Sequence, residues 1–136
     1  MRFGLTVTVV DASILFAALA DPRPHAQRIR GHLRTLNLEA PDFIHLEVTS
    51  VLRRHVAASL LGVQPAAEAL AALTSFPIAI HGVRPFIPRI WQLRHNISIY
   101  DAAYVALAEA TNSVLLTGDK RLAAAAAGIC NVEIVE

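Results

Sequence analysis

The sequence predicts an α/β protein in which a mainly parallel sheet is covered by helices on both faces. Short runs of β-branched and apolar residues alternate along the chain with longer helix-favouring segments, and this alternation is typical of a parallel sheet. Hydrophobic residues make up 54% of the 136 residues, which is enough for an extensive core. A chain of this length corresponds to one domain, so we expect residues 1–136 to form a single domain.

The first two predicted elements are a strand, Leu5–Val10, and a helix, Ala12–Ala20, separated by Asp11. The apolar stretch from Phe3 to Ala20 superficially resembles a signal peptide. However, an aspartate at the centre of a membrane helix costs about 2.5–3.5 kcal/mol on insertion scales. No other stretch approaches the roughly 18 apolar residues of a membrane span. We therefore expect a soluble, cytoplasmic protein that does not contact a membrane.

The remaining elements continue the alternation of strands and helices. Asp21-Pro22 predicts the start of a helix that runs to about Leu36, and Pro41-Asp42 precedes a longer helix that ends near Gly62. Further strands are predicted at Leu38–Ala40, Ile78–His81, Val114–Thr117 and Asn131–Val135. The helix after Pro41-Asp42 spans Phe43–Leu60, and further helices are predicted at Pro65–Phe76, Pro85–His95, Ser98–Asn112 and Asp119–Ala127. In such a fold the functional crevice lies at the carboxyl edge of the sheet.

Four carboxylates lie close to this edge in the predicted arrangement. Asp11 directly follows the first strand, and Asp119 follows a later buried strand after one glycine. Asp101 lies in the first turn of a helix, and Glu47 lies about one turn inside another. No short motif links the four residues, so only the fold can bring them together.

Each aspartate also has a structural explanation. Asp11 and Asp119 are suited to cap the helices that follow them, a role typically worth about 1 kcal/mol. Ser98 and Asp101 resemble a capping box. Glu47 is harder to explain in this way, because its helical neighbours one turn away are mostly apolar. These neighbours are Phe43, Ile44, Ser50 and Val51.

Taken together, the four carboxylates predict a metal site. Like charges at one sheet edge repel each other unless a cation neutralises them. Ligands that are all oxygen atoms suit a hard ion, Mg²⁺ or Mn²⁺, that keeps water and substrate phosphate in its remaining positions. Such an ion activates water and stabilises charge on a phosphodiester under attack. The chemistry therefore favours metal-dependent transfer of a phosphoryl group to water.

Four segments of the chain resemble PIN-domain proteins, specifically the VapC-type ribonuclease toxins of bacterial toxin–antitoxin pairs. They are Val9–Leu15, Glu47 with the following Leu52-Arg53-Arg54, Ser98–Ala108 and Leu115–Leu122. They occur in the family's order and span nearly the whole chain. The resemblance implies a three-layer α/β/α sandwich and a Mg²⁺- or Mn²⁺-dependent endoribonuclease. It also implies that the catalytic, metal-binding cluster consists of Asp11, Glu47, Asp101 and Asp119.

The resemblance has further implications for the site and its partners. Ser13 and Thr117 match polar positions that orient ligands or metal-bound water. Because water attacks instead of the RNA's own 2′-hydroxyl, the products should carry 5′-phosphates. The expected partners are RNA, a small cognate antitoxin and a second copy of the chain in a homodimer. Two departures are the longer leader, Met1–Leu5, and a net charge of only +1, which does not mark an RNA-binding surface.

The antitoxin expectation has independent support in the high apolar content. Helices such as Ala12–Ala20 and Phe43–Leu60 would leave a groove for a partner helix. Tyr100 and Tyr104 are interpreted as helix-packing residues and not as platforms for RNA bases. The basic pairs Arg53-Arg54 and Lys120-Arg121 are interpreted as a solvated face, with contacts to RNA phosphates as the alternative.

Several other classes of protein fit the sequence less well. A deaminase site needs a pair of cysteines, and Cys130 is the only one. The six histidines show no zinc-protease pattern, and the chain has no glycine-rich phosphate loop. A receiver domain would have two adjacent acids after the first strand, whereas Ala12 follows Asp11. The remaining alternative is a catalytically silent PIN fold that binds RNA or protein, and the presence of all four acids argues against it.

Overall fold

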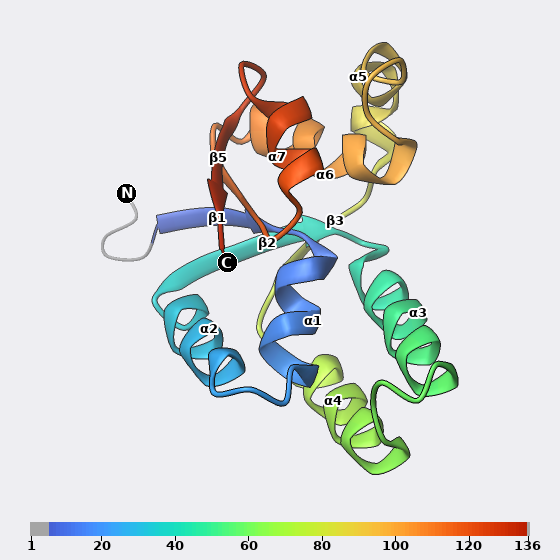
Figure 1. Ribbon diagram of the computed structural model, residues 1–136. Coiled ribbons are helices and arrows are strands. Elements are labelled where there is room, and N and C mark those ends of the chain that lie inside the picture. The colour runs from blue at the N-terminus through green and yellow to red at the C-terminus, as the bar shows by residue number, and fades with distance from the viewer. Residues whose placement is uncertain (1–5, 136) are drawn as a thin grey trace.

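Five parallel strands form one sheet in the order β3-β2-β1-β4-β5 in the computed structural model, which describes residues 6–135 (Figure 1). The strands are β1 (Thr6–Val10), β2 (Leu36–Pro41), β3 (Ala79–His81), β4 (Val114–Thr117) and β5 (Asn131–Ile134). Each pair of neighbouring strands is parallel, as the alternation of elements predicted. Residues Met1–Leu5, including the predicted strand start at Leu5, lie outside the described part of the chain.

Helices cover both faces of this sheet, which confirms the three-layer sandwich (Figure 1). On one side lie α1 (Ala12–Ala20), α2 (His25–Leu33), α3 (Ile44–Ala57) and α4 (Val63–Ser75). On the other side lie α5 (Ile87–Gln92), α6 (Ile99–Ala110) and α7 (Lys120–Ala126), with a 3₁₀ turn, η1 (Arg84–Phe86), before α5. None of the described helices is long and apolar enough to cross a bilayer.

Both predicted boundaries of the second helix were wrong. The helix expected from Asp21 begins only at His25, because the Asp21 carboxylate accepts the backbone N–H of Arg23 at 2.9 Å and forms a turn ahead of the helix. The same helix ends at Leu33 and not near Leu36, because Leu36 already pairs with β1 as the first residue of β2. The residues at the end of the predicted helix form backbone hydrogen bonds in the sheet as part of β2, so α2 is shorter than expected.

Another predicted helix, Pro85–His95, is divided between η1 and the short α5. Pro88 lies at the start of α5, where its missing N–H needs no helical partner. The proline thus marks a helix start, which is consistent with its expected place in a first turn.

The core lies on both faces of β1 and β4, which are the central strands next to each other in the sheet. Val9, Val10, Leu115 and Leu116 are all buried. In α6, the seven consecutive residues 102–108 are buried, so the middle of this helix is enclosed on all sides. The connections from β1 and β4 lead to opposite sides of the sheet, and the point between their carboxyl ends is where ligands bind in folds of this class.

Candidate active site

Asp11 lies at the carboxyl end of β1 and is only 5% exposed. Its Oδ1 accepts a hydrogen bond from Ser13 Oγ at 2.6 Å and one from the backbone N–H of Ile14 at 3.2 Å. Its Oδ2 accepts a hydrogen bond from the hydroxyl of Thr117 at the end of β4. Three donors therefore hold a buried carboxylate in one orientation and offset part of its desolvation.

Ser13 and Thr117 also join the turn after β1 to the turn after β4. The backbone N–H of Gly118 donates to Ser13 Oγ at 3.0 Å, and that of Asp119 donates to Thr117 Oγ1 at 3.0 Å. Both hydroxyls donate hydrogen bonds to the Asp11 carboxylate and fix its orientation.

Glu47 projects from α3 toward α6, and Tyr104 of α6 meets it. The Tyr104 hydroxyl donates to Glu47 Oε1 at 2.5 Å, across 57 positions of sequence. The tyrosine side chain is buried, whereas the glutamate is half-buried. This hydrogen bond supplies the partner that a carboxylate on a mostly apolar helix face requires.

Asp101 and Asp119 lie in the first turns of two helices on the other side of the sheet. Ser98 caps α6, because its Oγ accepts the backbone N–H of Asp101 at 3.4 Å. Asp119 caps α7, and its Oδ1 accepts the N–H groups of Arg121 at 2.9 Å and Leu122 at 3.2 Å. The helix-cap explanation is thus correct for Asp119, as it is for Asp11 at the start of α1.

The four carboxylates interact electrostatically with each other. Burial raises the pKa of Asp11, Glu47 and Asp101 above their usual values. The neighbouring negative charges add to this increase: Asp101 raises the pKa of Asp11 and Glu47, and Asp119 raises the pKa of Asp101. Among the described residues, the ion pairs involve other acids and none of these four.

The chemistry of these donors fits a hard divalent cation. Within residues 6–135, no three acidic, histidine or cysteine side chains lie close enough together to enclose one ion. Mg²⁺ is usually held by one or two carboxylates, with water and substrate phosphate in its other positions, so it needs no closed protein cage. Donor groups that are all carboxylate oxygens are therefore suited to Mg²⁺ or Mn²⁺ and unsuited to a softer metal.

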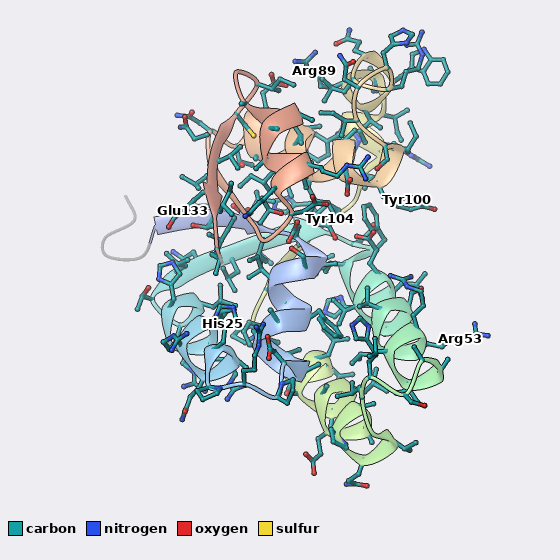
Figure 2. The ribbon with its side chains drawn as sticks, in the orientation of Figure 1. His25, Arg53, Arg89, Tyr100, Tyr104 and Glu133 are labelled. Carbon is teal, nitrogen blue, oxygen red and sulfur yellow. The ribbon has the colours of Figure 1, made fainter. Side chains whose placement is uncertain are left out.

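The sequence interpretation missed two features of the site. Tyr104 is a packing residue, as expected, but its hydroxyl also holds Glu47, and nothing in a run of buried residues indicated that contact. Tyr100 was expected to pack in the same way and is instead 61% exposed. Figure 2 shows both tyrosines at the junction of α6 with the start of α3. Their spacing of four residues places them on related faces of α6. Their different exposure therefore depends on the position of α3.

Comparison with known proteins identifies the family. The PIN domain model matches residues 8–128 of the chain. Ribonuclease VapC1 of Mycobacterium tuberculosis is 42% identical over 131 residues, which cover 93% of this chain and 96% of the relative. Among solved structures, PAE2754 from Pyrobaculum aerophilum superimposes with a TM-score of 0.71 at 22% identity, covering 94% of this chain and 91% of the other.

A toxin–antitoxin structure shares the same fold. VapBC2 from Rickettsia felis, bound to a DNA fragment from the promoter of its genes, matches with a TM-score of 0.67 at 12% identity, covering 96% of this chain and all of the matched chain. At these identities the two solved structures establish the fold, while the family model and the curated relative establish the family. The chain belongs to the PIN-domain family and, within it, to the VapC-type proteins.

Proposed function

We propose that this protein is the toxin of a toxin–antitoxin pair, a Mg²⁺- or Mn²⁺-dependent endoribonuclease. The observation that carries the proposal is the set of four coupled carboxylates beside the ends of β1 and β4, which no ion pair among the described residues neutralises. The catalytic and metal-binding residues in this proposal are Asp11, Glu47, Asp101 and Asp119. The ribonuclease name of the curated relative supports the same activity.

Each side chain of the site has a distinct role in the proposed mechanism. A bound Mg²⁺ or Mn²⁺ would supply positive charge for the phosphodiester and lower the pKa of water. Asp11, oriented by Ser13 and Thr117, keeps its oxygens in one position toward the substrate. Glu47, held by Tyr104, has a raised pKa and is suited to accept the proton of the attacking water at Oε2, the oxygen that Tyr104 does not occupy. Attack by water leaves a 5′-phosphate on the product.

Replacing Asp101 by Asn tests the proposal. The change keeps the size of the side chain and removes one charge, so the fold survives while metal-dependent cleavage of mixed RNA is lost. Glu133→Gln on β5 is the matched control, because this exposed acid lies away from the cluster (Figure 2). Equal cleavage by the parent and the folded Asp101→Asn protein would refute the assignment, and products with 2′,3′-cyclic phosphates would refute the water mechanism.

The same assay decides the alternative of a catalytically silent PIN fold that binds RNA or protein. A parent protein that binds RNA but leaves it intact with Mg²⁺ and with Mn²⁺ would establish that alternative. The retention of all four carboxylates favours catalysis, because a binding module gains nothing from four repelling charges at a phosphate-binding edge.

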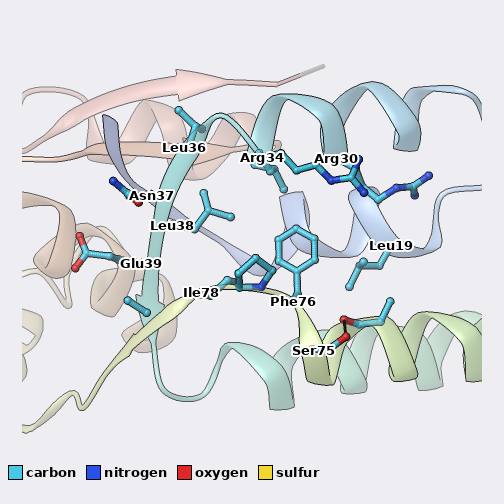
Figure 3. Close-up of a pocket in the computed structure, with 14 residues that line it drawn as sticks. Leu19, Arg30, Arg34, Leu36, Asn37, Leu38, Glu39, Ser75, Phe76 and Ile78 are labelled. Carbon is cyan, nitrogen blue, oxygen red and sulfur yellow. Dashed lines mark hydrogen bonds between the residues drawn. The ribbon is translucent and has the colours of Figure 1, made fainter. Parts of the chain in front are cut away.

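An antitoxin partner is the second part of the proposal, and a groove at the opposite edge of the sheet is suited to it. This groove has a volume of about 780 Å³ and is bounded by α1, α2, α4 and the start of β2 (Figure 3). Arg30 and Arg34 line it beside the apolar side chains of Leu19, Leu38 and Phe76. The mixture of apolar surface and guanidinium groups fits an amphipathic helix with acidic residues.

Of the two helices expected to leave a groove, α1 borders this one at Leu19 and α3 does not. The ring of Phe16 on α1 instead packs against that of His55 on α3 with a centroid distance of 4.6 Å, so α1 and α3 are in contact. Co-expression with the neighbouring upstream reading frame tests the partner. If the two proteins fail to co-purify and the chain alone is harmless to growth, the toxin assignment fails even when nuclease activity remains.

A homodimer acting in the cytoplasm completes the proposal. Large apolar side chains are exposed on α3 and α5, among them Leu46, Ile87 and Trp91. Surface of this kind commonly mediates association between protein chains. Sedimentation equilibrium of the purified chain measures the oligomeric state directly, and a monomer at all concentrations would refute the dimer.

A further inference from the structure

Tyr100 is an exposed aromatic residue at the rim of the acidic cluster. It directly precedes Asp101 in the first turn of α6, and 61% of its surface is accessible. Tyr104, one turn further along the helix, is only 1% exposed and contacts Glu47. Tyr100 therefore makes a small contribution to the core, and its position beside the site calls for another explanation.

The ring of Tyr100 is held in place by a neighbour. Phe43, at the start of α3, makes an edge-on contact with Tyr100 at a centroid distance of 5.2 Å and an interplanar angle of 84°. Phe43 makes a similar contact with Tyr104, at 5.6 Å and 81°. A continuous row of side chains thus connects the exposed ring to Glu47. Because the ring is already positioned, a ligand that stacks on it loses little additional side-chain entropy.

We propose that Tyr100 is a base-stacking residue that holds a nucleotide next to the phosphate being cut. This proposal rests on the ribonuclease function proposed above. Single-stranded RNA exposes bases that stack on aromatic side chains, and each such contact is sequence-tolerant because every base has a π-face. Since Tyr100 and Asp101 are consecutive residues, a base on this ring would belong to a nucleotide close to the scissile phosphate.

A second copy of the chain is the competing occupant of this surface, because Ile99, the residue before Tyr100, and Leu46, the residue before Glu47, are exposed as well. The neighbouring carboxylates disfavour a protein interface at this position. The centre of a protein interface is depleted in charged residues, whereas Tyr100 directly precedes the carboxylate of Asp101. Covering this edge with protein would desolvate carboxylates without neutralising them.

A double-mutant cycle that combines protein variants with altered RNA substrates tests whether a base stacks on Tyr100. The substrates are a single-stranded RNA oligonucleotide that the parent cuts at one position and two versions of it with an abasic nucleotide on either side of that position. For the intact RNA, Tyr100→Ala should lower kcat/KM about 5-fold to 100-fold, the range that base–aromatic stacking supplies. Tyr100→Phe should remain within about 2-fold of the parent, because the ring is retained. On one of the abasic RNAs, the parent and Tyr100→Ala should cleave equally, since the stacking partner is absent.

The controls separate the possible failures. Val63→Ala shortens an apolar side chain that is 75% exposed at the start of α4, and it should leave kcat/KM unchanged. If the parent cuts RNA and Tyr100→Ala loses nothing, the stacking proposal is overturned while the proposed function stands. An equal loss on the intact and both abasic substrates, or a loss accompanied by a changed sedimentation coefficient, would also overturn it and indicate a structural or dimer role. A parent that cuts no RNA overturns both proposals.

Discussion

Burial and hydrogen bonding act in opposite directions on Glu47. Desolvation is the larger effect and raises the pKa of the carboxyl group, as do the negative charges of Asp101 and Asp11. The hydrogen bond from Tyr104 lowers the pKa, because it stabilises the ionised form. Burial and the charge of Glu47 in turn raise the pKa of the tyrosine, so its hydroxyl remains a neutral donor throughout the accessible pH range.

Replacing Tyr104 by Phe isolates this hydrogen bond, because the ring stays in the core. The free energy of unfolding at pH 7 should fall by about 1.5–3 kcal/mol, the usual contribution of a hydrogen bond to a charged group. The pKa of Glu47 should increase, which an NMR titration of the metal-free protein measures. Tyr100→Phe is the control, because it removes the hydroxyl of an exposed tyrosine in the same helix. An unchanged Glu47 pKa in Tyr104→Phe would contradict the assigned role of the hydroxyl.

At the scale of single elements, the site uses the same carboxylates to begin helices and to gather negative charge. Asp11 begins α1 and Asp119 begins α7, each by accepting backbone N–H groups of the first turn. The positive end of a helix dipole favours an anion at that position. These caps partly stabilise charges that would otherwise only repel, which explains how acidic residues accumulate at one sheet edge in a stable fold.

Two substitutions of Asp119 separate the cap from the charge. Asp119→Ala removes both, whereas Asp119→Asn keeps an oxygen acceptor for the N–H groups of Arg121 and Leu122. The alanine variant should be less stable than the asparagine variant by about 1 kcal/mol, the typical value of an N-cap. Urea denaturation of the two metal-free proteins measures the difference. RNA cleavage should decrease in both variants, and full activity in Asp119→Asn would remove this residue from the catalytic set.

For the whole molecule, the raised pKa values make stability depend on pH. Asp11, Glu47 and Asp101 have higher pKa values in the folded chain than in the unfolded chain, whose values are about 4. The folded chain therefore binds more protons between the two values. The stabilisation from these groups is complete below the unfolded pKa and is lost as the pH rises through the folded pKa. Asp21 acts in the opposite sense, but its pKa is lowered to about 2, so its effect lies at more acidic pH.

The metal-free protein should accordingly lose stability through these three groups as the pH rises from about 4, the unfolded value, toward neutral pH. Glu47→Gln should be more stable than the parent near pH 7 and should show a weaker pH dependence, because one repelling charge is gone while an oxygen can still accept from Tyr104. Urea denaturation across this range with a chelator measures both effects, with Glu133→Gln as the control. A folded Glu47→Gln protein that is less stable than the parent would instead indicate a structural role for the Glu47 charge.

Added Mg²⁺ should reverse this loss of stability. An ion that binds only the folded chain stabilises it by about 2.7 kcal/mol at 100 times its dissociation constant. The increase in Tm should be larger at pH 7 than at pH 5, because the metal binds ionised carboxylates. The increase should be smaller in Glu47→Gln than in Glu133→Gln. An identical metal response in the parent and in Glu47→Gln would exclude Glu47 from the ion's ligands.

The sequence by itself determined the α/β class, the parallel sheet, most helix positions and the position of the acids Asp11 and Asp119 at the ends of strands. These features depend on local patterns, since apolar periodicity, capping residues and prolines act within a few residues of each other. Helix ends were the weaker predictions where a strand competed for the same residues, as β2 did for Leu36.

Only the tertiary structure decided which side chains meet. Thr117 contacts Asp11 across 106 positions because β4 is the neighbour of β1, and nothing local to either residue specifies that strand order. The different environments of Tyr100 and Tyr104 depend on where Phe43 and Glu47 of another helix lie against α6. Contacts of this kind arise when the whole chain packs, because the free energy that selects one strand order and one helix rotation is shared among all the buried side chains of the core.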